Sequence, residues 1–228
     1  MSSSGHGKEF VAFSEDSFSW QYLERPTMDL YLGEAYKQNP KVLDAGCGAG
    51  RVTGHLVDRG IPTENICGID IDKDMAESYA ASYQLARVVR GRVSQLPFRA
   101  DTFDIIVSNM LLHQMNGSDL QKFLEESSRV LASKGTLLFI DSNPYSSSDR
   151  ASNIGRWITQ RTPWGTEIQV YIHDLKGVLS SEMLGEIGLE LVAQSEPKVA
   201  QEGRQANLAE YTRYTRSNFR FAAKLVKV

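Results

Sequence analysis

Short apolar runs of strand length alternate along most of the chain with segments whose apolar residues recur at helical spacing. Polar and glycine-containing turns separate these segments. The pattern predicts strands at 41–45, 65–70, 87–90, 103–108 and 136–141, and helices at 49–59, 73–85 and 118–131. An alternation of this kind is typical of a parallel sheet with helices on both faces.

The two ends of the chain depart from this rhythm. Residues 27–38 carry apolar side chains at helical spacing and predict a helix before the first strand. After the strand at 136–141 the alternation stops, and we interpret 142–173 as an inserted lid that precedes a helix near 174–186. The remaining apolar runs predict strands at 189–194 and 219–228. Because no helix-sized amphipathic pattern lies between them, these two strands are expected to pair antiparallel.

Composition narrows the class of protein. The 228 residues are 41% hydrophobic and 23% charged, which is ordinary for a soluble chain with one core. No apolar stretch approaches the ~20 residues that a membrane-spanning helix needs, and residues 1–7 are read as a loose tail rather than a secretory signal. Cys47 and Cys67 suit a reducing cytosol better than a disulfide framework, and no metal-ligand spacing is visible. We therefore expect a cytoplasmic protein without a metal site or a membrane partner.

The charge of the chain bears on its partners. A net charge of −3 argues against nucleic acid, because binding to phosphates relies on an excess of positive charge. One stretch nevertheless interleaves basic and aromatic residues, namely Arg204, Tyr211, Arg213, Tyr214 and Arg216. We interpret it as a solvated hairpin.

The most informative stretch follows the first predicted strand. It reads Asp44-Ala45-Gly46-Cys47-Gly48-Ala49-Gly50, an acidic residue followed by alternate glycines. Such glycines allow a tight turn and a close approach of the backbone to a nucleoside-bearing cofactor. Asp70 ends the next strand, where a carboxylate can accept hydrogen bonds from both hydroxyls of a ribose. Dinucleotide-binding and S-adenosylmethionine-binding folds share this arrangement.

Asp44 favours the second of these two folds. It would put negative charge where a pyrophosphate should lie, whereas a cationic sulfonium cofactor with an ammonium group tolerates it. The glycine motif closely resembles the first motif of the class I S-adenosylmethionine-dependent methyltransferases of small-molecule type, and the resemblance extends from about Tyr22 to the C-terminus. Residues 90–98 resemble the segment that lines the adenine in this family. Residues 103–110 resemble its fourth strand and the loop beneath the transferred methyl.

The resemblance implies an α/β fold in three layers. We expect a Rossmann-like, seven-stranded, mostly parallel sheet with an antiparallel last strand, helices on both faces, and cap segments at the N-terminus and after the fifth strand. The chain is expected to form a single domain, 1–228. Its parts would be an N-terminal cap and helix (1–40), a cofactor-binding core (41–141), a substrate lid (142–173), and a C-terminal helix with strands (174–228).

The resemblance also implies which residues hold S-adenosyl-L-methionine. They are Tyr22, Arg25, Asp44, Ala45, Gly46, Gly48, Gly50, Asp70, Ile71, Val93, Ser94, Asn109 and Met110. The sequence departs from the family at Arg92, where relatives usually carry an aspartate that meets the adenine amino group. Adenine recognition would then fall to the backbone of Val93 or to Ser94.

His113 is the candidate catalytic residue. It follows the fourth strand at the carboxyl edge of the sheet, where ligands bind in such folds, and an imidazole can remove a proton from the methyl acceptor. The alternative is that it only packs or forms hydrogen bonds. Candidate substrate residues come from the lid, whose amide and aromatic groups suit a flat or partly apolar acceptor. These are Asn143, Tyr145, Trp157, Trp164 and His173.

Together these features predict an S-adenosylmethionine-dependent methyltransferase that acts on an oxygen, nitrogen or carbon nucleophile of a small molecule. One alternative is a catalytically silent protein that binds the cofactor, since no residue is indispensable in the way that a covalent nucleophile is. The other alternative is a nicotinamide-dependent oxidoreductase, which NAD would stabilise and S-adenosylhomocysteine would not. The methyl acceptor and the oligomeric state are left open.

Overall fold

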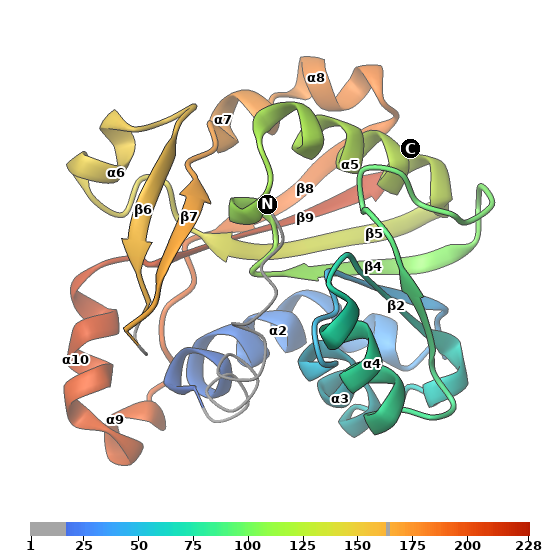
Figure 1. Ribbon diagram of the computed structural model, residues 1–228, viewed down its shortest axis with the longest axis horizontal. Coiled ribbons are helices and arrows are strands. Elements are labelled where there is room, and N and C mark those ends of the chain that lie inside the picture. Colours follow the sequence, from blue (N-terminus) through green and yellow to red (C-terminus); the bar gives the residue numbers. More distant parts are fainter. Residues whose placement is uncertain (1–16, 163–164) are drawn as a thin grey trace.

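A seven-stranded sheet forms the centre of the molecule. The structure is a computed structural model, and it describes residues 17–162 and 165–228. The strand order is β3-β2-β1-β4-β5-β9-β8 (Figure 1). The strands are β1 (Val42–Ala45), β2 (Ile66–Asp70), β3 (Arg87–Arg90), β4 (Phe103–Asn109), β5 (Leu131–Ser142), β8 (Leu189–Ser195) and β9 (Arg220–Lys227). Strands β1 to β5 are parallel, whereas β9 runs antiparallel to both β5 and β8. The expected α/β fold with an antiparallel last strand is confirmed.

Helices cover both faces of this sheet, because apolar side chains leave each strand in alternate directions. On β1, Leu43 packs in the core cluster of α5, while Val42 packs in the cluster of α2 and α3. Figure 1 shows α5 and α8 on one side of the sheet and α2 and α3 on the other. The longer helices are α2 (Arg25–Tyr36), α3 (Arg51–Asp58), α4 (Lys73–Ser82) and α5 (Gly117–Val130), and shorter turns are η1 (Trp20–Glu24), η2 (Thr63–Asn65) and η3 (Leu112–Gln114). Within the described residues no helix has the length and apolarity to cross a bilayer.

The segment after β5 forms a unit that shares no strand pairing with the central sheet. Helix α6 (Ser148–Ser152) leads into an antiparallel hairpin of β6 (Trp157–Arg161) and β7 (Glu167–Tyr171). This hairpin is a separate two-stranded sheet. The single helix expected near 174–186 is divided into α7 (Leu175–Val178) and α8 (Ser181–Glu186).

One sequence prediction is wrong. Residues 204–216 were expected to form a solvated hairpin, and the structure has α9 (Gly203–Ala206) and α10 (Leu208–Arg216) there. Asn207 caps α10, because its side-chain oxygen accepts a hydrogen bond from the Glu210 backbone amide at 3.1 Å. No residue of α10 is buried and most of its residues are polar or charged, so the segment resembles solvated chain.

Candidate cofactor and acceptor site

The glycine motif forms a tight loop between β1 and α3. Gly46, Gly48 and Gly50 all have positive φ angles, of 73°, 53° and 99°, in a region that favours glycine. A side chain at Gly46 would collide with the protein itself, since its Cβ would lie 2.7 Å from Leu111 Cδ1. A Cβ at Gly48 would meet only Met75 Sδ, at 3.9 Å. The open space therefore lies beside Gly48.

Asp70 at the end of β2 is bound to the glycine loop. Its Oδ2 accepts a hydrogen bond from the Gly48 backbone amide at 2.8 Å, and its Oδ1 accepts one from the Asp72 amide at 2.9 Å. Asp72, not Asp70, caps α4. Each carboxylate oxygen of Asp70 can accept a further hydrogen bond. Beside it, Ile71 is 52% exposed. Burial raises the pKa of Asp70, although the backbone hydrogen bonds oppose that shift.

Asp44 lies beneath the loop and holds α3 against it. Its Oδ2 accepts hydrogen bonds from the backbone amide and the hydroxyl of Thr53, at 3.2 and 2.9 Å. The hydroxyls of Thr53 and Tyr79 lie 2.9 Å apart and extend this buried chain. The other carboxylate oxygen is buried and has no partner among the described residues. Burial raises the pKa of Asp44 to about 7, against the hydrogen bonds from Thr53 that lower it.

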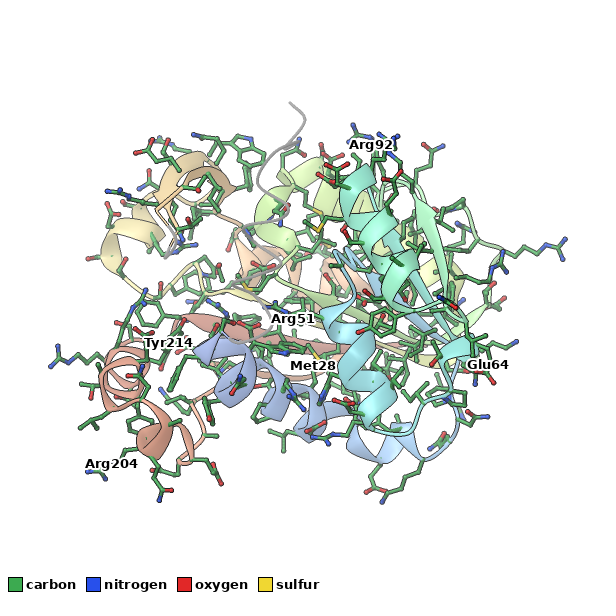
Figure 2. The ribbon with its side chains drawn as sticks, turned by 60° about the horizontal axis from the view of Figure 1, so that its bottom comes forward. Met28, Arg51, Glu64, Arg92, Arg204 and Tyr214 are labelled. Carbon is green, nitrogen blue, oxygen red and sulfur yellow. The ribbon has the colours of Figure 1, made fainter. Side chains whose placement is uncertain are left out.

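Glu24 joins four segments that are far apart in sequence. Its carboxylate lies 2.9 Å from Arg220 Nε on β9 and 3.4 Å from Arg51 Nη2 on α3, and it accepts a hydrogen bond from Asn109 Nδ2 on β4 at 3.1 Å. Only 1% of Glu24 is exposed. Burial alone would raise the pKa of Glu24, but the charges of Arg220 and Arg51 and the hydrogen bonds lower it. Figure 2 shows Arg51 toward the middle of the molecule and Arg92 at its rim.

The end of β4 is shaped by this contact. Since the amide nitrogen of Asn109 faces Glu24, its carbonyl oxygen faces away, and that oxygen is buried without a partner among the described residues. Met110 follows with a φ of 57°, which is uncommon for a residue with a side chain. Its backbone amide is held by the Ile140 carbonyl at 2.9 Å. Asn109 and Met110 thus leave the sheet in a fixed conformation.

Two side chains of α5 form hydrogen bonds with the segment that is expected to line the adenine. Arg129 donates hydrogen bonds to the carbonyls of Leu96 and Phe98, at 2.9 and 2.8 Å, and pairs with Glu126 at 2.7 Å. Glu126 in turn accepts a hydrogen bond from the Leu96 amide at 2.7 Å. These hydrogen bonds hold the loop at Leu96 and Phe98, a few residues after Val93 and Ser94.

Two residues of the N-terminal segment point to other partners. Arg25 Nε donates to His55 Nδ1 at 3.2 Å and lies 3.8 Å from Asp58, so it faces the second half of α3. The Tyr22 ring packs against Phe18, and the Tyr22 carbonyl accepts a hydrogen bond from the Ala200 amide. Their assignment to the cofactor stays a prediction.

His113 is paired with a buried acid. Its Nδ1 lies 2.8 Å from Asp141 Oδ1, at the end of β5. The Asp141 carboxylate also accepts hydrogen bonds from the backbone amides of Leu112 and Ser142, both at 2.7 Å. Burial alone would raise the pKa of Asp141, but His113 and these hydrogen bonds lower it. The carboxylate can therefore hold the proton of His113 on Nδ1, which leaves Nε2 free to accept another.

The predicted substrate residues lie in different places. His173 lines one cavity with His113 and donates from Nε2 to the Leu112 carbonyl at 2.8 Å. Asn143 is buried and connects β5 to β9 through the Asn218 carbonyl at 2.9 Å. The Tyr145 hydroxyl lies 3.2 Å from Asp174 at the start of α7. Trp157 is 46% exposed on the hairpin, and Trp164 lies outside the described residues.

Comparison with known proteins identifies the central segment. Residues 43–139 match the sequence profile of a family described as a methyltransferase domain. A stretch of 107 residues is 29% identical to an uncharacterized methyltransferase of Synechocystis sp., and covers 47% of this chain and 49% of that protein. A stretch of 104 residues is 32% identical to the demethylmenaquinone methyltransferase of Bacillus licheniformis, and covers 44% of each protein. The chain thus spans less than half the length of these curated relatives.

The fold agrees with the sequence match. The crystal structure of an S-adenosylmethionine-dependent methyltransferase from Mesorhizobium loti superposes with a TM-score of 0.65, covering 86% of this chain and 97% of that one at 15% identity. Residues 43–139 thus match a methyltransferase domain in sequence, and the chain shares the fold of that crystal structure. The glycine loop, Asp70 and the end of β4 all fall within the matched segment.

Several residues of the candidate site were not predicted from the sequence. Glu24, Asp141 and Arg129 each contact a candidate residue or its loop, but none was selected. Glu24 is separated from Asn109 by 85 residues and from Arg220 by 196. Only the topology of the sheet brings such partners together, so no local pattern could have revealed them.

We expect Glu24→Gln to destabilise the folded protein by about 3–5 kcal/mol, because it leaves two partly or fully buried arginines without their counter-charge. Urea denaturation followed by circular dichroism measures this change. Glu34→Gln is the matched control, because Glu34 forms an exposed pair with Lys37 at 2.8 Å, and its loss should cost about 1 kcal/mol or less. Equal effects of the two substitutions would contradict a central role for the Glu24 cluster.

Proposed function

We propose that the protein is an S-adenosylmethionine-dependent methyltransferase that acts on a small-molecule acceptor. The observation that carries this proposal is Asp70, which is hydrogen-bonded to the Gly48 amide at 2.8 Å in a methyltransferase domain. That contact couples the carboxylate that suits a ribose to the glycine loop that suits the rest of a nucleoside cofactor. The demethylmenaquinone methyltransferase relative supports a small molecule as acceptor.

The residues around the loop fit a cationic cofactor. Asp44 and Asn109 each have a buried oxygen that lacks a partner among the described residues. Both are acceptors, and a sulfonium with an ammonium group offers positive charge and N–H donors to such atoms. A pyrophosphate would meet the Asp44 carboxylate with like charge, so the nicotinamide alternative is disfavoured.

His113 is the group best placed to move a proton. S-adenosylmethionine supplies a methyl group that is already activated for nucleophilic attack. The free Nε2 of His113 would take the proton of an acceptor hydroxyl or amine as that atom bonds to the methyl carbon. The thioether portion of the cofactor would be the leaving group. Asp141 stabilises the resulting imidazolium through Nδ1, at 2.8 Å.

The decisive experiment is incubation of the protein with methyl-labelled S-adenosylmethionine and fractionated cell extract. We expect label in a small organic product. Tight binding of the cofactor with no label in any fraction would favour a catalytically silent binding protein. Thermal stabilisation by NAD and none by S-adenosylhomocysteine would instead favour the oxidoreductase.

We expect Asp70→Ala to weaken the binding of S-adenosylhomocysteine by about 1–3 kcal/mol, because two hydrogen bonds lose their charged acceptor. Isothermal titration calorimetry measures the change. Asp74→Ala is the control, since Asp74 is an exposed carboxylate in the first turn of α4. Unchanged affinity in Asp70→Ala, with intact folding, would remove Asp70 from the cofactor site.

For His113→Gln we expect a loss of turnover of about 100-fold or more with nearly unchanged cofactor binding, because a general base contributes to the chemical step rather than to affinity. Single-turnover rates with the labelled cofactor test this expectation. The control is Gln114→Ala, an exposed substitution in the same turn. Full activity of His113→Gln would leave His113 with a packing role.

A further inference from the structure

Arg150 is a half-buried cation that forms no ion pair with a carboxylate of the described residues. It lies on α6, and among the described residues its only side-chain hydrogen bond goes from Nη1 to Gln160 Oε1, at 2.7 Å. Its Nε is buried and has no partner there, and Nη2 forms no hydrogen bond with the described residues either. One edge of the guanidinium, Nε with Nη2, therefore remains unused. Burial lowers the pKa of Arg150, which reflects the cost of this position.

The other partly buried arginines of the structure are compensated. Arg51 and Arg220 share Glu24, and Arg129 pairs with Glu126. An arginine that keeps its charge away from water normally needs such a partner. The Asp141 carboxylate attracts Arg150, but its oxygens already bind His113 and two backbone amides. The missing counter-charge at Arg150 calls for an external anion.

Arg150 faces the same cavity as the candidate base. His113, Asp141, Arg150, Tyr171 and His173 line this cavity, together with apolar residues that include Pro144. The Tyr171 ring packs against His173 at 4.8 Å and provides an aromatic wall. The cavity thus combines a cation, a proton acceptor and an apolar surface, the combination expected of a site for a small organic anion.

We propose that Arg150 is the anchor for a carboxylate on the methyl acceptor, so that the acceptor is a small organic acid with a separate hydroxyl or amine that meets His113. This inference rests on the proposed function and narrows its substrate class. The Nε and Nη2 edge of a guanidinium matches the two oxygens of a carboxylate in a bidentate pair. The acid group serves only as the anchor, and the methyl group is transferred to the second group of the acceptor.

The hairpin forms part of the wall of this cavity. The cavity volume is about 10 Å³, which is room for about one water molecule and far below the roughly 300–1,000 Å³ usual for ligand sites. Gln160, which holds Arg150, belongs to β6, and Tyr171 belongs to β7. An acceptor would therefore enter only if the hairpin moved outward, and such a movement would break no strand pairing of the central sheet, because the hairpin is a separate sheet.

The test compares benzoate with benzamide, two probes of the same shape that differ in charge. Each is titrated into the protein with and without saturating S-adenosylhomocysteine, and binding is followed by saturation-transfer NMR and calorimetry. Arg150→Gln removes the proposed anchor. Arg156→Gln is the matched control, because Arg156 is an exposed arginine between α6 and the hairpin.

We expect wild-type protein and Arg156→Gln to bind benzoate in preference to benzamide, and Arg150→Gln to weaken benzoate binding about tenfold or more without changing benzamide binding. Equal binding of the two probes, or no loss in Arg150→Gln, overturns the proposal. Binding of S-adenosylhomocysteine is measured in the same samples. Its absence would refute the proposed function, while the anchor would still be judged by the cofactor-free titration.

Discussion

The buried carboxylate of Glu24 is the interaction on which the candidate site depends. It neutralises Arg51 and Arg220 and orients the amide of Asn109, so one side chain connects the N-terminal segment, the helix after the glycine loop, the end of β4 and the start of β9. Each of these charges would be costly alone in the interior. Together, these contacts hold the helix after the glycine loop next to the end of β4. Side chains from both segments could therefore reach the same ligand.

The central sheet and the inserted hairpin contribute in different ways. Parallel strands bring the ends of β1, β2, β4 and β5 to one edge, and the loops there carry the glycines, Asp70, Asn109 and the pair of His113 with Asp141. Backbone hydrogen bonds from the neighbouring strands and loops hold these groups. Arg150, in contrast, belongs to the segment after β5, which is free of that pairing. The proposed cofactor site thus lies on the central sheet, whereas the proposed anchor for the acceptor lies on the inserted segment.

Local patterns revealed the core but not the contacts across it. The glycine motif and the strands β1, β2 and β4 were predictable because apolar periodicity and turn chemistry act over a few residues. Glu24, Asp141 and Arg150 were not predicted as site residues, because their roles depend on partners that only the fold brings together. Helix α10 was missed because all its residues are at least partly exposed and most of them are polar or charged.

The buried Asp44 oxygen that has no partner among the described residues makes the charge of this acid sensitive to what lies beside it. Burial raises the pKa of Asp44 to about 7, so its ionisation near neutral pH depends on the charges around it. A cation arriving beside that oxygen would favour the ionised form and expel the proton. Binding of a cationic ligand would thus be accompanied by ionisation of Asp44. A neutral analogue of the same shape would not cause this ionisation.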